Sequence, residues 1–355
     1  LHAQMEHRRL VTSVRKFLDT GQVPVPSEVV FEPTQRCNLR CTMCHQDRMA
    51  LGKQGELTLE QIVAFFDRNT QFQKVSLIGG EVFVRRDMVA IIRYLNRNRN
   101  IVLSTNGTLV GNEEIETLRS CKRIFTICIS LDGTKAVHDS IRRVDGAYDK
   151  AIRTIESLAP FLPVTVNCVI LEENLECLAE VVDVCASMGV KKIKLEFERK
   201  FPEEMIYQTL DEFKLKPDEL PIASNGRAKT YCPNTLKDRL AECQDQGKKQ
   251  EVYVAFDPPF LMDEIEACYA GNIRTQKKCI CDNFRRAVIS PNGDLVHCFI
   301  IRKTFGNILH DSFDEIWNSE TANEFSLHLL QNNLTPLCES CPSMVPCRDN
   351  YNLNT

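Results

Sequence analysis

Short apolar runs alternate along the chain with longer segments whose apolar residues recur at the spacing of one helix face. The runs "EVVFEP", "KVSLIGG", "IVLSTNG", "IFTICISLDG", "VTVNCVIL" and "KKIKLEFE" predict six strands. Segments such as "TLEQIVAFFDRN", opened by a capping box of Thr58 and Gln61, predict the helices between them. Strands with few polar positions are expected where both faces of a parallel sheet are covered. The pattern therefore predicts repeated right-handed βαβ units.

These units predict the fold class and the domain organisation. Six of them fall short of the eight in a full barrel, so we expect an α/β fold with a partial (β/α)6 TIM-like barrel over residues 28–200. Residues 1–27 predict an N-terminal helical extension, and residues 201–275, rich in Pro, Lys, Glu and Gln, predict a linker with some helix. In such folds, function is expected at the carboxyl ends of the strands.

Residues 276–355 predict a small cysteine-rich domain with a β-hairpin and a helix. Two β-like runs in "RAVISPNGDLVHCF" flank Asn292-Gly293, a strong hairpin signal. The segment "SFDEIWNSETANEFSLHLLQ" predicts one helix, with Ser312 and Glu315 spaced as a capping box.

Composition narrows the class of protein. Hydrophobic residues make up 43% of the 355 positions, enough for a core, and the formal net charge of −4 does not suggest a nucleic-acid partner. No apolar run is long enough to span a membrane, and no leader is visible at the start. We therefore expect a soluble, cytoplasmic protein.

The 17 cysteines favour metal sites over disulfides, because many of them are grouped at short spacings. The scattered ones lie inside apolar patterns and are expected to be small buried side chains, namely Cys121, Cys128, Cys168, Cys177 and Cys185.

The segment "CNLRCTMC" places Cys37, Cys41 and Cys44 directly after the first predicted strand. A structural zinc site normally takes four protein ligands, whereas thiolates at tight spacings hold iron–sulfur clusters. Three thiolates on a four-iron cluster leave one iron open. His45 is a weak alternative fourth ligand, because it adjoins Cys44 and would strain to reach the same cluster.

Cys-x3-Cys-x2-Cys after the first strand of a partial βα barrel resembles the radical S-adenosylmethionine (SAM) superfamily. The resemblance implies that the amine and carboxylate of SAM chelate the open iron, with Met43 near the adenine. Gly79-Gly80-Glu81, after the second strand, resembles the family's motif for the SAM amino group. Glycines permit close backbone approach and a carboxylate can pair with an ammonium.

Two further segments, "STNGT" and "SLDG" followed by "HDSIRR", resemble motifs of the same families. The resemblance covers residues 28–200 and implies contacts to the ribose or carboxylate of SAM from Ser104, Asn106, Ser130 and either Arg142 or Arg143. The alternative is plain turn chemistry, since Asn-Gly and Asp-Gly form turns anyway.

The resemblance also implies the chemistry. A reduced cluster donates one electron to SAM, methionine leaves, and a 5′-deoxyadenosyl radical abstracts a hydrogen atom from substrate, while the protein binds and orients. The chain would then be an oxidoreductase or maturase-type enzyme. It would need a low-potential electron donor, flavodoxin or ferredoxin-like.

The C-terminal cysteines resemble the SPASM/Twitch extension of radical SAM enzymes, which carries auxiliary four-iron clusters. Tyr351 stands where the full SPASM pattern has a further cysteine, so one auxiliary cluster is expected rather than two. Its expected ligands are Cys281, Cys298, Cys338 and Cys341, with Cys279 and Cys347 as alternates. Zinc on four cysteines is the alternative. The cluster would accept an electron from the substrate radical or only shape the pocket.

The substrate is constrained only weakly. Lys194 and Glu198 share one face of the sixth strand with Glu196, so a base or substrate anchor is possible there, with a salt-bridged strand end as the alternative. Phe299 stands where sulfatase-maturing relatives carry Asp, which argues against that activity.

Three hypotheses follow for the function. The first is oxidation or cross-linking of a peptide or small metabolite, assisted by the auxiliary cluster. The second is redox-neutral chemistry, such as epimerisation or rearrangement, with a structural second cluster. The third, a non-enzymatic electron carrier, is disfavoured because a carrier does not need "GGE", "STNGT" and "SLDG" on successive loops.

Overall fold

The structure is a computed structural model of the 355-residue chain. It describes residues 19–21, 25–44, 55–198, 201, 203–220, 222, 232–257, 265, 286–296, 298–331 and 337, with the backbone alone at 329–331. The N-terminal extension expected at 1–27 therefore lies mostly outside the described residues. None of the helices in these ranges is both long and apolar enough to cross a membrane.

One curved sheet organises the described part of the chain, in the order β10-β9-β8-β1-β2-β3-β4-β5-β6-β7. The strands are β1 Glu28–Thr34, β2 Lys74–Gly79, β3 Asn100–Thr105, β4 Ile124–Ser130, β5 Val164–Ile170, β6 Lys192–Phe197, β7 Tyr253–Asp257, β8 Arg286–Ile289, β9 Asp294–Val296 and β10 Thr304–Asn307. Strands β1 to β7 pair in parallel, and β8 joins β1 in parallel.

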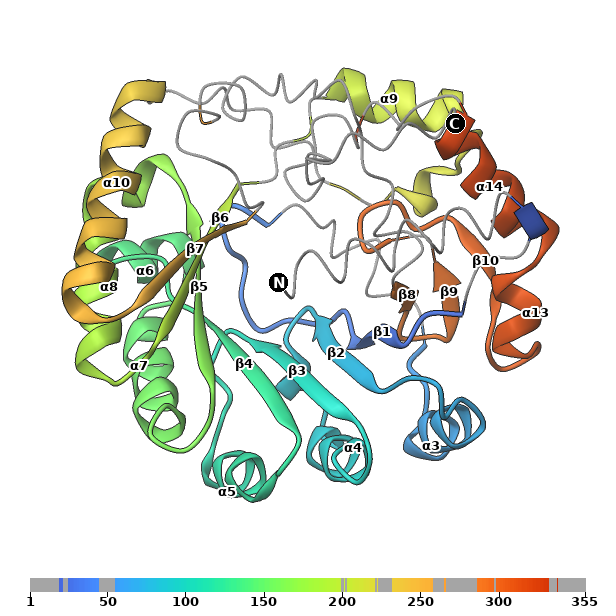
Figure 1. Ribbon diagram of the computed structural model, residues 1–355, viewed down its shortest axis with the longest axis horizontal. Coiled ribbons are helices and arrows are strands. Elements are labelled where there is room, and N and C mark those ends of the chain that lie inside the picture. Colours follow the sequence, from blue (N-terminus) through green and yellow to red (C-terminus); the bar gives the residue numbers. More distant parts are fainter. Residues whose placement is uncertain are drawn as a thin grey trace.

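The helices are α3 Leu59–Arg68, α4 Met88–Leu95, α5 Asn112–Ser120, α6 Lys135–Arg142, α7 Ala147–Leu158, α8 Leu178–Ser187, α9 Glu203–Glu212, α10 Pro233–Gln250, α13 Phe313–Trp317 and α14 Glu320–Gln331, with 3-10 turns η1 Val82–Val84, η2 Glu172–Cys177 and η3 Pro217–Glu219. Most of them lie along the outside of the curved sheet, whereas α9 and α14 lie toward its open side (Figure 1). The βα alternation predicted for residues 28–200 is confirmed, as is the partial-barrel fold class.

Burial alternates along the central strands. On β3, Leu103 is fully buried in the core beneath the helices, whereas Ser104 is partly exposed. Strands β4 and β6 show the same period of two. The scarcity of polar positions in these strands predicts apolar residues on both faces. The inner face instead carries polar side chains, because it lines the interior of the barrel at the end where a site can form.

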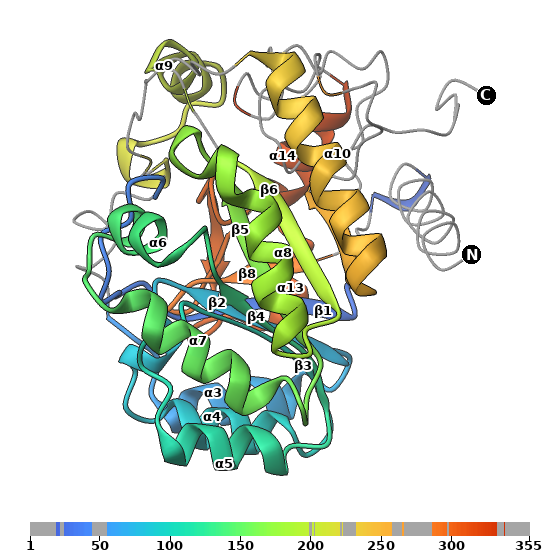
Figure 2. The same ribbon diagram turned by 90° about the vertical axis from the view of Figure 1, so that its left-hand side faces the viewer.

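Residues 201–275, expected to be a linker with some helix, contain a further helix–strand unit. Helix α10 packs beside α8 (Figure 2), and β7 extends the sheet by pairing in parallel with β6. The sequence does not indicate this helix–strand unit, because α10 buries only a narrow stripe of residues, formed by Leu236, Leu240, Cys243 and Gly247. The division into domains with boundaries near 200 and 275 stays a proposal.

The C-terminal hairpin is confirmed. Strands β8 and β9 pair antiparallel around Asn292-Gly293, and Gly293 has a φ of 91°, a left-handed conformation that favours glycine. The single helix expected over 312–331 is two helices, α13 and α14. The capping box of Ser312 and Glu315 opens α13 as predicted, and that of Thr58 and Gln61 opens α3.

Candidate active site

The loop of Cys37, Cys41 and Cys44 follows the carboxyl end of β1, as the alternation of strands and helices in the sequence predicts. All three side chains are partly exposed, and so is Met43. The backbone N–H of Leu39, which is buried in the core, donates to Cys37 Sγ at 3.5 Å. The loop is thus anchored by one apolar side chain while its sulfurs stay accessible.

Two neighbouring loops hold the cysteine loop. From the β3 end, Asn106 Nδ2 donates to Asn38 Oδ1 at 3.0 Å, and Asn38 Nδ2 donates to Thr108 Oγ1 at 2.8 Å. From α6, the carbonyl of Ile141 accepts a hydrogen bond from the N–H of Thr42 at 2.9 Å. Asn106, expected to contact SAM, therefore has a second task in binding the cysteine loop.

Gly79 and Gly80 lie against the backbone of the same loop. A Cβ added at Gly79 would come within 2.1 Å of the Thr34 carbonyl oxygen, and one at Gly80 within 2.2 Å of the Arg36 carbonyl oxygen. The N–H groups of Gly80 and Glu81 donate to these same two oxygens, at 3.1 and 2.8 Å. The glycines therefore allow the end of β2 and the start of the cysteine loop to touch, and a larger residue would force them apart.

Glu81 is almost fully buried, and its carboxylate is already engaged. It accepts hydrogen bonds from Thr105 Oγ1 at 2.7 Å, from the Asn106 N–H at 2.6 Å and from the Phe83 N–H at 3.2 Å. Burial raises the pKa of Glu81 in spite of these bonds. These bonds hold Glu81 to the β3 loop, where it positions Asn106, and its expected pairing with the SAM ammonium stays a prediction.

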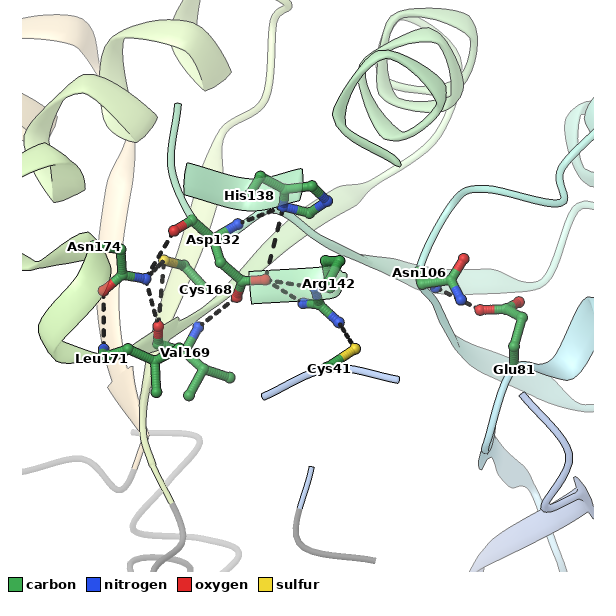
Figure 3. A network of polar contacts seen from close by, with 10 residues as sticks. All are labelled: Cys41, Glu81, Asn106, Asp132, His138, Arg142, Cys168, Val169, Leu171 and Asn174. Carbon is green, nitrogen blue, oxygen red and sulfur yellow. Dashed lines mark hydrogen bonds and ion pairs between the residues drawn. The ribbon is translucent and has the colours of Figure 1, made fainter. Parts of the chain in front are cut away.

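Arg142 reaches the cysteine loop from α6 (Figure 3). Its Nη1 donates to Cys41 Sγ at 3.6 Å, and its Nε and Nη2 contact Asp132 Oδ2 at 2.6 and 2.5 Å. Burial opposes the charged guanidinium, but the charges of Asp132 and Cys41 outweigh it and raise the pKa of Arg142. Arg143, the alternative candidate, ends the helix in an exposed left-handed conformation, so of the two only Arg142 approaches a cysteine.

Asp132 is the centre of a buried network that the sequence analysis quoted within "SLDG" without assigning it a role. Its Oδ1 accepts from the Val169 N–H at 3.0 Å, and its carbonyl accepts from Asn174 Nδ2 at 2.7 Å. Its own N–H donates to His138 Nδ1 at 3.0 Å, and burial lowers the pKa of His138 to about 4. The imidazole is therefore neutral, and the network rigidly orients Arg142.

A polar row crosses the inner face of the barrel. Ser130, Asn167 and Lys194 are register neighbours on β4, β5 and β6. Lys194 Nζ contacts Glu196 Oε1 at 2.7 Å and Asp257 Oδ2 at 3.1 Å. These two carboxylates raise the pKa of Lys194 even though burial works in the opposite direction. The salt-bridged arrangement left open for this strand is the one observed, and Asp257 was missed because β7 was assigned to a linker.

Ser104 also lies on the inner face, opposite Cys128 on β4. Glu198 follows β6 and is partly exposed. The four candidate side chains Ser104, Ser130, Lys194 and Glu198 therefore come from strands or strand ends of one barrel, and contact of any of them with SAM or substrate stays a prediction.

Cys298 is the one expected auxiliary-cluster ligand within the described residues. Its Sγ accepts hydrogen bonds from the N–H groups of Ile300 at 3.4 Å and Ile301 at 3.1 Å. The remaining expected ligands and alternates, Cys281, Cys338, Cys341, Cys279 and Cys347, lie outside the described residues, as does His45. The ligand set of the second site therefore stays a prediction.

The donor set fits an iron–sulfur cluster. Three thiols leave one loop, and N–H groups point at Cys37 and Cys41, the pattern that stabilises thiolates on a cluster. Among the described residues, no three His, Cys, Asp or Glu side chains gather closely enough for a single metal ion. The ligands of a four-iron cluster bind different iron atoms, so they need not converge on one point.

Two family models match the chain. The model of the radical SAM superfamily covers residues 31–185, and that of the SPASM iron–sulfur cluster-binding domain covers residues 279–342.

Curated relatives resemble the chain over different lengths. The subtilosin biosynthesis protein AlbA of Bacillus subtilis is 27% identical over 84% of this chain and 61% of its own length. The mycofactocin maturase MftC of Mycolicibacterium smegmatis is 27% identical over 96% of this chain and 80% of its own. An AdoMet-dependent heme synthase of Methanosarcina barkeri is 33% identical over 46% of this chain and 48% of its own. The chain thus spans less than two thirds of AlbA and of this heme synthase.

Solved structures share the fold. SuiB of Streptococcus suis, bound to its precursor peptide SuiA, superimposes with a TM-score of 0.65 at 16% identity, over 94% of this chain and 73% of that one. The enzyme anSMEcpe with bound AdoMet gives a TM-score of 0.63 at 18% identity, over 92% and 91%. Together with the cysteine loop at the end of β1, the two matching domain models show that this chain belongs to the radical SAM superfamily and carries a C-terminal SPASM domain.

Proposed function

We propose that this radical SAM enzyme abstracts a hydrogen atom from a peptide substrate and oxidises or cross-links it, with one auxiliary cluster in the SPASM domain assisting. The observation that carries the proposal is the cysteine loop, which Gly79-Gly80 and Arg142 hold from two sides at the end of β1. Its combination with a SPASM domain favours a reaction that uses a second redox centre.

The cysteine loop and Arg142 have separate roles in this proposal. Cys37, Cys41 and Cys44 hold a [4Fe–4S] cluster, which when reduced supplies the electron that cleaves SAM to methionine and a 5′-deoxyadenosyl radical. Arg142 places a permanent positive charge beside Cys41, where it can also attract the carboxylate of SAM.

The remaining candidates bind the rest of SAM. In this proposal Met43 packs on the adenine, the backbone at Gly79-Gly80 approaches the amino group, and Ser104, Ser130 and Asn106 contact the ribose or carboxylate. Glu81 acts through Asn106, whose backbone N–H it holds.

The inner barrel face positions the substrate. Lys194 keeps its proton because Glu196 and Asp257 stabilise the ammonium, so it orients substrate groups rather than removing a proton. Glu198, at the end of β6, is a second anchor.

The comparisons support a peptide as substrate without naming one. SuiB was solved with a precursor peptide, anSMEcpe with peptides, and MftC is named a maturase. A second candidate is a tetrapyrrole, because the Fe-coproporphyrin III synthase of Methanosarcina barkeri matches 91% of this chain at 24% identity. A cytoplasmic location and a flavodoxin or ferredoxin-like electron donor complete the proposal.

The first test needs no substrate. Anaerobically reconstituted protein, reduced with dithionite and mixed with SAM, should form 5′-deoxyadenosine and methionine in equal amounts, and the Cys41→Ala variant should form neither. If wild-type protein with a full iron content releases no 5′-deoxyadenosine, the proposed function is wrong.

The second test separates the substrate classes. Peptides encoded beside the gene and a set of tetrapyrroles are each added, and the masses of the products are measured by mass spectrometry. Loss of two hydrogens from a peptide supports oxidation or cross-linking. An unchanged mass in H2O, together with one deuterium gained when the reaction is run in D2O, supports the redox-neutral alternative. Conversion of a tetrapyrrole alone would overturn the peptide proposal.

A further inference from the structure

A buried ion pair joins strand β1 to the turn before β10. Arg302 Nη2 and Nη1 contact Glu32 Oε2 and Oε1 at 2.7 and 3.2 Å, in a two-pronged arrangement. Glu32 is 0% exposed and Arg302 is 5% exposed. The two residues are 270 positions apart in the sequence, so no local pattern brings them together.

Each partner lies on a segment that carries cluster cysteines. Glu32 belongs to β1, which runs directly into the cysteine loop, and Gln35, at the start of that loop, donates its Nε2 to Glu32 Oε2 at 3.1 Å. Arg302 belongs to the turn that begins at Cys298, where the Cys298 N–H donates to the Ile301 carbonyl at 3.1 Å. The ion pair is thus a direct link between the segment holding Cys37 and the segment holding Cys298.

The turn is held on its other side as well. The N–H of Arg302 donates to the Glu219 carbonyl at 2.6 Å, and Lys303 Nζ contacts Glu219 Oε1 at 3.5 Å. Arg302 is therefore located by its backbone and by its guanidinium at once, which leaves the turn little freedom to move relative to β1.

The chemistry of the ion pair favours a role in fixing the relative position of the two segments over a role in stabilising the fold. Removing two charges from water is costly, and apolar residues would often fill the same space as stably. The ion pair instead favours a single relative geometry of the two side chains, because only the two-pronged contact satisfies both buried charges. Arg36 and Glu56 form a similar two-pronged pair on the cysteine loop, but it is exposed and water can replace either partner.

We propose that the Glu32–Arg302 ion pair is a positioning device that fixes the Cys298 turn relative to the cysteine loop, and so sets the separation of the two iron–sulfur sites. This inference rests on the proposed function, because it requires a cluster at each site. The two residues act through the loops they hold.

The test measures the magnetic interaction between the two reduced clusters by electron paramagnetic resonance. Two variants avoid leaving a lone buried charge: Arg302→Lys keeps the charge but lacks the fork, and the double variant Glu32→Gln/Arg302→Gln removes both charges. Each is expected to change the microwave power for half-saturation by about threefold or more, with the wild-type iron content retained. The control Lys248→Gln, which breaks the exposed Lys248–Asp245 pair on α10, should leave the spectrum unchanged.

The failure of this inference is distinguishable from that of the proposed function. If wild-type protein cleaves SAM and holds both clusters, yet Arg302→Lys and the double variant show the wild-type interaction, the positioning role is wrong and the enzyme assignment stands. If iron analysis of the wild-type protein finds no second cluster, the inference is also overturned. Absence of 5′-deoxyadenosine from wild-type protein tells against the proposed function itself.

Discussion

The two sulfur-bearing loops are held by different kinds of contact. The cysteine loop after β1 packs against two glycines, and the Arg142 side chain reaches its Cys41. The Cys298 turn satisfies its sulfur with its own backbone N–H groups and is joined to the barrel through Arg302. Neighbouring elements therefore reach the first loop, at Cys41 from α6, whereas the Cys298 sulfur accepts hydrogen bonds from its own turn.

This difference teaches which changes should affect one site and spare the other. A change at the end of β2, in the loop after β4 or in α6 should disturb the first loop, because their residues contact it directly or through Arg142. The same change should leave the Cys298 turn in place. Four predictions test the contrast, in order of decreasing effect.

Removal of a cluster ligand should separate the two sites completely. Cys41→Ala is expected to abolish 5′-deoxyadenosine formation, because the remaining two thiols of the loop cannot hold a four-iron cluster with one open iron. Cys298→Ala should retain SAM cleavage while the iron content falls. Mössbauer spectra and iron analysis of both variants check this. Equal loss of SAM cleavage in the two variants would break the comparison.

Asp132→Asn should destabilise the first region strongly. Arg142 would keep its buried charge without its partner, which costs about 3–5 kcal/mol of the free energy of unfolding. Denaturant unfolding at neutral pH measures the loss. Lys135→Gln is the matched control, because it breaks the exposed Lys135–Asp149 pair on the same helix, which solvent screens, and it should leave the free energy of unfolding nearly unchanged.

The pH dependence of stability should carry the signature of His138. Its pKa is about 4 in the folded protein against about 6.5 in the unfolded chain, so the unfolded state binds the extra proton first as pH falls. Its contribution, about 3 kcal/mol, should be complete above pH 6.5 and be lost toward pH 4. Burial is the main cause; the nearby charges of Asp132, Asp139 and Arg142 partly oppose one another.

His138→Asn checks this prediction, because its side-chain oxygen can still accept the Asp132 N–H but does not titrate in this range. Between pH 4 and 6.5, the free energy of unfolding of the variant should depend less on pH than that of the wild-type protein, because the His138 contribution is gone. An unchanged slope would show that His138 is charged or accessible in the folded protein.

Gly80→Ala should have the smallest effect of the four and should again be confined to the first loop. The new methyl group would lie 2.2 Å from the Arg36 carbonyl oxygen, and overpacking of this kind costs about 1–3 kcal/mol. Iron incorporation into the first site should fall with it. Gly55→Ala, where a Cβ meets nothing within 4 Å, is the control and should incorporate iron as the wild-type protein does.

Much of the fold could be predicted because its signals are local. The alternation of strands and helices over residues 28–200, the Asn292-Gly293 hairpin and both capping boxes depend on residues close in sequence. Strand β7 was not predicted, because the helix before it, α10, shows only a narrow apolar stripe. A helix that is only partly buried, as α10 is beside α8, needs no wider apolar face.

The candidate site divides in the same way. The position of Cys37, Cys41 and Cys44 at the end of β1 follows from the spacing and the order of elements. The hydrogen bond from the Asn106 N–H to Glu81 did not follow, because it depends on how the β3 loop packs; whether Glu81 also pairs with SAM stays a prediction. The sequence did not distinguish Arg142 from Arg143 as the residue near the cofactor. In the structure Arg143 caps the carboxyl end of α6 and is exposed, whereas Arg142 is buried.

The sequence alone thus determined the βα rhythm, the place of the cysteine loop and the existence of a second cysteine group, because these depend on periodicity and short spacings. The tertiary structure decided which charged groups meet: Arg142 with Asp132 and Cys41, and Arg302 with Glu32 across 270 positions. The reason is physical. A buried charge must be paired, but its partner is chosen by how the elements pack, and neither residue alone records that choice.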